Sequence, residues 1–273
     1  MTRTQTACHG GVQSFHSHNS KATGTVMQFG LFTPPGSGPF PVLWCLAGLT
    51  CNEETFAIKA GAQALAAELG LMLITPDTSP RGDGVADDPA WDVGQAASFY
   101  LDATNPPWAA HFRMRTWLID ELPALIATNF PADLARQGIT GHSMGGHGAL
   151  TLALKHASVF RSVSAFAPIV APTQVPWGQK ALLAYLGDDP AAWAVHDACA
   201  LIDGGARVAD LLVDQGEADQ FLEPQLRPEL LASACARAGI PLTLRRHAGY
   251  DHSYWFVQSF VGDHLRWHAA RLR

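Results

Sequence analysis

The sequence has 273 residues, of which 48% are hydrophobic and only 15% are charged. This composition is typical of a globular protein with a large buried core, and it excludes a chain that is mainly disordered. The formal net charge of −6 disfavours a nucleic-acid groove or an anionic membrane surface as the partner. We therefore expect one domain over residues 1–273, for which a small-molecule substrate remains possible.

The first ten residues contain no apolar run of the kind that a secretory signal needs, so we expect the protein to be cytoplasmic. The longest apolar stretches, such as residues 42–49, are too short to span a bilayer. The cysteines are odd in number and widely scattered, which predicts free thiols rather than a disulfide framework or a structural zinc site. They are Cys8, Cys45, Cys51, Cys199 and Cys235.

Residues 11–32 alternate polar and apolar side chains around a turn at residues 18–21, which predicts an antiparallel hairpin at a sheet edge. Short apolar runs then alternate with longer helical patterns, which is typical of a mostly parallel sheet. The predicted strands are 42–47, 71–75, 138–140, 163–167, 211–213 and 242–245. The predicted helices are 54–69, 114–129 with an interruption at Pro123, 145–155, 225–238 and 253–271. Residues 79–107 and 168–190 are rich in turn formers, and we expect them to be long functional loops.

The sequence Gly-His-Ser-Met-Gly at residues 141–145 has the G-x-S-x-G pattern, follows a predicted strand and opens a predicted helix. This context is typical of a nucleophile elbow, in which a strained turn projects the serine hydroxyl outward. Because the bare pattern also occurs by chance, it needs support from other residues. We predict that Ser143 is a nucleophile in an α/β-hydrolase fold, with an antiparallel N-terminal edge on a mostly parallel sheet and helices on both faces.

An α/β-hydrolase places its acid and then its histidine on loops after later strands. The segment 214–219 follows one such strand and offers three carboxylates, those of Asp214, Glu217 and Asp219. We favour Asp219, since Asp214 lies closer to the strand end and the longer side chain of Glu217 is suited to solvent. His252 follows the last predicted strand in a glycine-containing loop, and we predict that it is the general base.

The oxyanion of an acyl-transfer intermediate needs two hydrogen-bond donors. One is predicted to be the N–H of Met144, which follows the nucleophile, and the other the N–H of Leu49 in the loop after residues 42–46. A plain turn is the alternative for that loop. His264 and His268 have helical spacing, but no acidic partner accompanies them, so we predict an amphipathic surface helix and no metal.

With these residues in view, the chain resembles the S-formylglutathione hydrolases, the esterase D family, over nearly its whole length. The matching segments are LAGLTC at 46–51, DTSPRG at 77–82, FYLDAT at 99–104, GHSMGGHG at 141–148, PWG at 176–178, DQGEAD at 214–219 and YDHSY at 250–254. The resemblance implies the same triad, and substrate contacts at Cys51, Lys59, Trp177 and Lys180.

The resemblance also implies the reaction, in which S-formylglutathione and water give glutathione and formate without a cofactor, as a step in formaldehyde detoxification. It further implies a homodimer and a carboxylesterase side activity. One alternative is a general short-acyl carboxylesterase that uses the same triad. A noncatalytic binding module on a hydrolase scaffold is another, since a fold alone does not guarantee activity.

Overall fold

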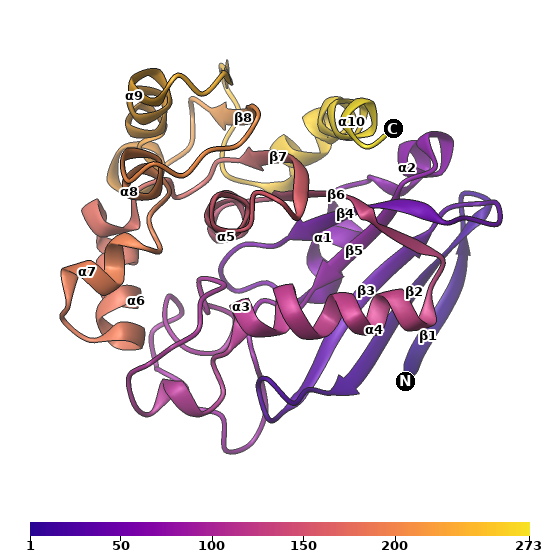
Figure 1. Ribbon diagram of the computed structural model, residues 1–273, viewed down its shortest axis with the longest axis horizontal. Helices are drawn as coiled ribbons and strands as arrows, with labels where there is room; N and C mark the ends of the chain where they lie inside the picture. Colours follow the sequence, from indigo (N-terminus) through magenta and orange to yellow (C-terminus); the bar gives the residue numbers. More distant parts are fainter.

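A nine-stranded sheet forms the centre of the computed structural model, which describes all 273 residues (Figure 1). Its strand order is β1-β2-β3-β5-β4-β6-β7-β8-β9. The strands are β1 (Thr2–Cys8), β2 (Gly11–Asn19), β3 (Val26–Thr33), β4 (Phe40–Leu46), β5 (Met72–Pro76), β6 (Ala132–Gly141), β7 (Phe160–Phe166), β8 (Leu211–Gly216) and β9 (Leu242–His247). The pairs β1/β2, β2/β3 and β3/β5 are antiparallel, and the other five are parallel. The predicted mostly parallel sheet with an antiparallel N-terminal edge is therefore confirmed.

Burial explains which strands the sequence reveals. All five residues of β5 and six of the seven in β4 are buried or face the core, so these strands are continuous apolar runs. The hairpin of β2 and β3 is confirmed, and it alternates because one face is buried. Strand β1 was not predicted, since six of its seven residues are exposed and leave no buried face to read.

Helices cover the two faces of the sheet. They are α1 (Glu53–Lys59), α2 (Gln63–Leu69), α3 (Met114–Thr116), α4 (Leu122–Asn129), α5 (Met144–Lys155), α6 (Pro176–Leu186), α7 (Pro190–Ala194), α8 (Ala198–Asp203), α9 (Pro228–Ala238) and α10 (Tyr254–Arg271). Helix α5 packs against β6 and β7 on one side, while α10 packs on α2, β7 and β8 on the other (Figure 1). One cluster of 69 buried apolar residues runs through these layers.

Three helix predictions need correction. The single helix expected at 54–69 is two helices, because the chain turns at Gly61, which has a φ of +65°. In the segment 114–129 a π-helical turn, Trp117–Glu121, precedes α4, and Pro123 lies in the first turn of α4, where its missing N–H is tolerated. The helix expected to begin at residue 225 begins at Pro228, after a second π-helical turn.

The loop prediction for residues 168–190 is wrong, since α6 occupies eleven of these residues. Its proline, tryptophan and glycine lie in the first turn, where Pro176 is well suited to a helix start, so turn-forming residues hid a helix N-terminus. The segment 79–107 does lack long elements. No helix of the protein has both the length and the apolar character needed to cross a bilayer.

Candidate active site

Ser143 lies at the turn between β6 and α5. Its backbone has φ 59° and ψ −120°, a conformation that side chains other than glycine rarely adopt and that costs about 1–3 kcal/mol. Hydrogen bonds to both neighbouring strands hold it there: the Ser143 N–H donates to the Phe166 oxygen at 2.9 Å, and the His142 N–H to the Leu46 oxygen at 3.0 Å. The strained elbow predicted from the sequence is present.

Close packing explains a glycine beside this turn. A Cβ on Gly145 would lie 2.2 Å from the carbonyl oxygen of Leu46, far inside van der Waals contact. Because that oxygen is backbone of β4, it cannot move aside without disturbing the sheet. Gly145 is therefore what lets helix α5 start directly against β4 with Ser143 at its N-terminus.

A chain of two short hydrogen bonds joins Ser143 to the acid. His252 Nε2 lies 2.9 Å from Ser143 Oγ, and His252 Nδ1 lies 2.6 Å from Asp219 Oδ2. Since a carboxylate only accepts, Nδ1 carries the proton, which leaves Nε2 free to accept the serine proton. The Phe221 N–H donates to Asp219 Oδ1 at 2.8 Å, and Gln215 Nε2 donates to Oδ2 at 3.3 Å. The carboxylate is thus fixed before any substrate arrives.

The other two candidate acids do not hydrogen-bond to His252. Asp214 is fully buried and accepts from Arg245 through Nε and Nη2, both at 2.6 Å. The guanidinium and the nearby His264 hold the pKa of Asp214 below its ordinary value despite its burial. Glu217 is exposed. The structure therefore gives Asp214 a role in linking β8 to β9, and places Asp219 alone against the imidazole.

A second imidazole, that of His142, lies beside His252 with the ring centroids 4.6 Å apart. Burial, with the nearby His252 adding to the effect, holds the pKa of His142 well below its ordinary value. His142 therefore stays neutral at neutral pH and adds no positive charge next to the imidazolium that proton transfer would form on His252. Sequence reasoning gave no role to this residue.

The loop after β4, residues 47–51, passes directly over the nucleophile. A Cβ on Gly48 would lie 3.1 Å from Ser143 Cβ, so the backbone itself approaches the serine. No group of the protein accepts a hydrogen bond from the N–H of Leu49. Met144 is the first residue of α5, and its N–H has no acceptor within the helix. Both amides predicted to hold an oxyanion are thus free to do so.

A cavity of about 910 Å³ opens above Ser143. Its lining includes the sequence-predicted residues Cys51, Lys59 and Trp177. Lys180 does not line it, because its ammonium forms an ion pair with Asp92. Sequence reasoning missed further lining residues, which are Ile58, Trp91, Phe221, Tyr254, Trp255 and Gln258. The position of Trp255, directly after the YDHSY segment, is the one sequence signal that could have pointed to it.

The helix carrying His264 and His268 is not a surface helix, which corrects the expectation for these residues. Both side chains are buried, with exposed fractions of 1% and 0%. His268 pairs with Ser162 and Ser164, and His264 with Ser164, at 2.7–2.8 Å. No group of three or more metal-ligating side chains has an arrangement that could hold a metal ion.

Comparisons with known proteins agree with this geometry. The model of the esterase family, described as putative esterase, matches residues 20–267. The S-formylglutathione hydrolase of Paracoccus denitrificans is 54% identical over 273 residues, covering 99% of this chain and 98% of that protein.

Solved structures show the same relationship. That of an S-formylglutathione hydrolase from Agrobacterium tumefaciens is 49% identical, covers 100% of this chain and 99% of its own, and superposes with a TM-score of 0.99. A fluorophosphonate-binding serine hydrolase from Staphylococcus aureus, 18% identical, shares the fold with a TM-score of 0.75 over 95% and 98% of the two chains. The chain therefore belongs to the esterase family of serine hydrolases, among the S-formylglutathione hydrolases.

Proposed function

We propose that this protein hydrolyses S-formylglutathione to glutathione and formate, with Ser143 as the nucleophile. The observation that carries the proposal is the hydrogen-bonded chain from Ser143 through His252 to Asp219 at the base of a large cavity. The 54% identity to a curated S-formylglutathione hydrolase supports the choice of substrate. Cleaving one thioester needs no redox or group-carrying cofactor, because water is the only other reactant.

In the first half of the reaction, Ser143 Oγ attacks the formyl carbonyl carbon while His252 Nε2 accepts the hydroxyl proton. The carbonyl oxygen becomes an oxyanion that the N–H groups of Leu49 and Met144 can hold. When the tetrahedral intermediate collapses, the carbon–sulfur bond breaks, glutathione leaves with a proton from His252, and formyl-Ser143 remains. A thiol leaves more readily than an alcohol, so this step needs little acid assistance.

In the second half, water takes the place of glutathione. His252 accepts a proton from the water as its oxygen attacks the formyl carbon, and the same two amides hold the second oxyanion. Collapse releases formate and returns the proton to Ser143. Asp219 keeps the proton of His252 on Nδ1 throughout and stabilises the imidazolium in both halves.

The cavity mouth is suited to a peptide-like thiol. Glutathione carries two carboxylates, and Lys59 is a lining residue whose ammonium can attract one of them. Trp91 packs edge-on against Trp177 with centroids 5.3 Å apart, and Trp177 in turn lies 4.6 Å from Phe221. This aromatic wall leads down to His252, which lies 5.1 Å from Phe221.

Two further lining residues are strongly exposed for apolar side chains. Trp255 is 77% exposed and Ile58 is 67% exposed. A bound tripeptide would cover part of both, and the apolar area removed from water would favour binding at about 25 cal/mol per Å². We propose that these residues, with Lys59, hold the glutathione portion, and that the enzyme serves formaldehyde detoxification in the cytoplasm as a homodimer.

The test compares kcat/KM for S-formylglutathione and for p-nitrophenyl acetate. The proposal expects a much higher value for the thioester, because binding energy from the tripeptide is used in the transition state. Lys59→Gln should lower only the thioester value, while Lys180→Gln, which alters a lysine outside the cavity, should change neither. Good ester turnover with poor thioester turnover would instead make the protein a short-acyl carboxylesterase. Failure to turn over either would revive the binding-module alternative.

A further inference from the structure

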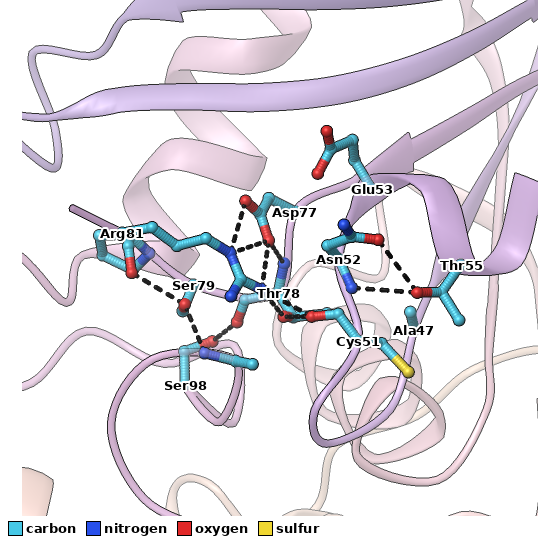
Figure 2. Close-up of polar contacts among 12 residues, drawn as sticks. Ala47, Cys51, Asn52, Glu53, Thr55, Asp77, Thr78, Ser79, Arg81 and Ser98 are labelled. Carbon is cyan, nitrogen blue, oxygen red and sulfur yellow. Dashed lines mark hydrogen bonds and ion pairs between the residues drawn. The ribbon is translucent and has the colours of Figure 1, made fainter. Parts of the chain in front are cut away.

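The loop of residues 47–51, which offers the Leu49 amide, is held from its far side by the segment 77–81. Arg81 Nη2 donates a hydrogen bond to the carbonyl oxygen of Cys51 at 2.6 Å, and Thr78 Oγ1 donates to the same oxygen at 2.5 Å (Figure 2). Neither side chain lines the substrate cavity. Both therefore contact the loop without reaching the space where a substrate would bind.

Arg81 is itself fixed by a buried carboxylate. Its Nε lies 3.0 Å from both oxygens of Asp77, and its Nη2 lies 2.9 Å from Oδ1. Burial raises the pKa of Asp77 to about 6, and the guanidinium of Arg81 opposes that rise. The carboxylate is consequently ionised at neutral pH, and the Thr78 N–H donates to it at 2.7 Å. The donor that reaches Cys51 is thus mounted on a rigid ion pair.

The rest of the loop is also tied down, but in a strained form. Tyr100 Oη donates to the Ala47 oxygen at 2.8 Å, and the Thr50 N–H donates to the Ala96 oxygen at 3.0 Å. Thr50 has a φ of +66°, which a threonine adopts only when its surroundings impose it. Because the loop has no regular secondary structure, these side-chain contacts, and not a sheet or helix ladder, set the position of the Leu49 amide.

We propose that Arg81 is a positioning residue for the reaction, which holds the Cys51 carbonyl so that the Leu49 N–H stays aimed at the oxyanion. The inference rests on the proposed function, since it takes Leu49 as an oxyanion donor. Loss of one such donor costs about 10²–10³-fold in kcat, and a shift of about 0.5 Å already weakens a preorganised site. Arg81 acts through the loop and does not touch the substrate.

Three variants test this: Arg81→Met removes the clamp, Arg81→Lys keeps the charge but not the forked donor, and Arg237→Met is the control. Arg237 forms a forked pair with Asp203 on the surface, far from the loop in the fold. The readouts are kcat and KM per titrated active site, and inhibition by two compounds. A thioether trifluoromethyl ketone forms an oxyanion on the enzyme, whereas S-methylglutathione occupies the site without one.

We expect Arg81→Met to lower kcat about 10–100-fold with KM within about twofold, and to weaken the trifluoromethyl ketone by the same factor. S-methylglutathione inhibition should not change, Arg81→Lys should recover part of kcat, and Arg237→Met should match the wild type. An Arg81→Met enzyme with unchanged kcat and unchanged trifluoromethyl ketone affinity per active site would overturn the proposal.

If Arg81→Met does not fold, Thr78→Val removes the other donor to the Cys51 oxygen and leaves the Asp77–Arg81 pair intact. It should lower kcat and the trifluoromethyl ketone affinity together, by about three- to tenfold. Equal kcat and affinity in Thr78→Val and the wild type would then overturn the proposal. All variants are also assayed with p-nitrophenyl acetate, because the oxyanion forms with either substrate. Failure of the proposed thioester activity in the wild type therefore stays distinguishable from failure of the clamp.

Discussion

The two buried aspartates that follow β8 provide a sharp test of the account, since the same substitution should have opposite consequences at the two positions. Asp219→Asn removes the acceptor that lies 2.6 Å from His252 Nδ1 and replaces it with an amide that can present N–H groups. The imidazole then loses its preferred tautomer and the stabilisation of its charged form. We expect kcat to fall about 10³–10⁴-fold, or about 4–5.5 kcal/mol in the activation barrier.

Asp214→Asn should instead affect stability. The Asp214 carboxylate is fully buried and accepts two hydrogen bonds at 2.6 Å from Arg245, which is 31% exposed. Removing one partner of a buried ion pair costs about 3–5 kcal/mol, and the partial exposure of Arg245 favours the lower end of that range. Since Asp214 does not contact His252, the folded variant should keep a kcat near that of the wild type.

The assay measures urea unfolding and kcat per active site, titrated with a fluorophosphonate, for both variants at neutral pH. Asp219→Asn should unfold near the wild-type midpoint, because its backbone contacts and the Gln215 contact allow an amide in place. The reasoning would be refuted by an Asp219→Asn enzyme that keeps a tenth or more of the wild-type kcat, or by an Asp214→Asn enzyme that loses as much kcat as Asp219→Asn.

Two further predictions concern buried groups. His147 is buried, which with the nearby Lys155 lowers its pKa from an ordinary 6.5 to about 3, so the unfolded chain takes up its proton first as the pH falls. Acidification from about pH 7.5 to about pH 5.5 should therefore cost about 1.4 kcal/mol of unfolding free energy through this group, and His147→Gln should show a correspondingly smaller drop in urea titrations. Cys51 lines the cavity and burial raises the pKa of its thiol, so N-ethylmaleimide should inactivate the enzyme slowly. S-methylglutathione should protect against this loss and Cys51→Ala should resist it; labelled Cys51 with full activity would contradict the placement.

Buried strands and the order of chemical residues were the parts of the protein that the sequence revealed. Strand β4 has a continuous apolar run because both of its faces are covered, and the order of Ser143, Asp219 and His252 along the chain restricts which loops can meet. Strand β1 and helix α6 were missed for opposite reasons. One has no buried face, and the other begins with residues that elsewhere form turns.

Contacts between distant segments set the limits of the site prediction. Lys180 pairs with Asp92, which is 88 residues earlier in the chain, and no local pattern indicates that partner. Likewise, Arg81 meets the Cys51 carbonyl 30 residues away through a backbone atom, which has no residue-type signature. Trp255 and Ile58 are exposed apolar residues at the cavity, and the sequence alone does not distinguish an exposed apolar side chain from a core one.

The most direct test of the central claim is the turnover of S-formylglutathione by Ser143→Ala beside the wild type, with formate and free thiol both measured. The account predicts rapid, stoichiometric release of both products by the wild type. It also predicts a loss of about 10⁴–10⁶-fold in kcat for Ser143→Ala, with an unfolding midpoint close to that of the wild type. A correctly folded Ser143→Ala enzyme that releases formate at near wild-type rates would contradict the account.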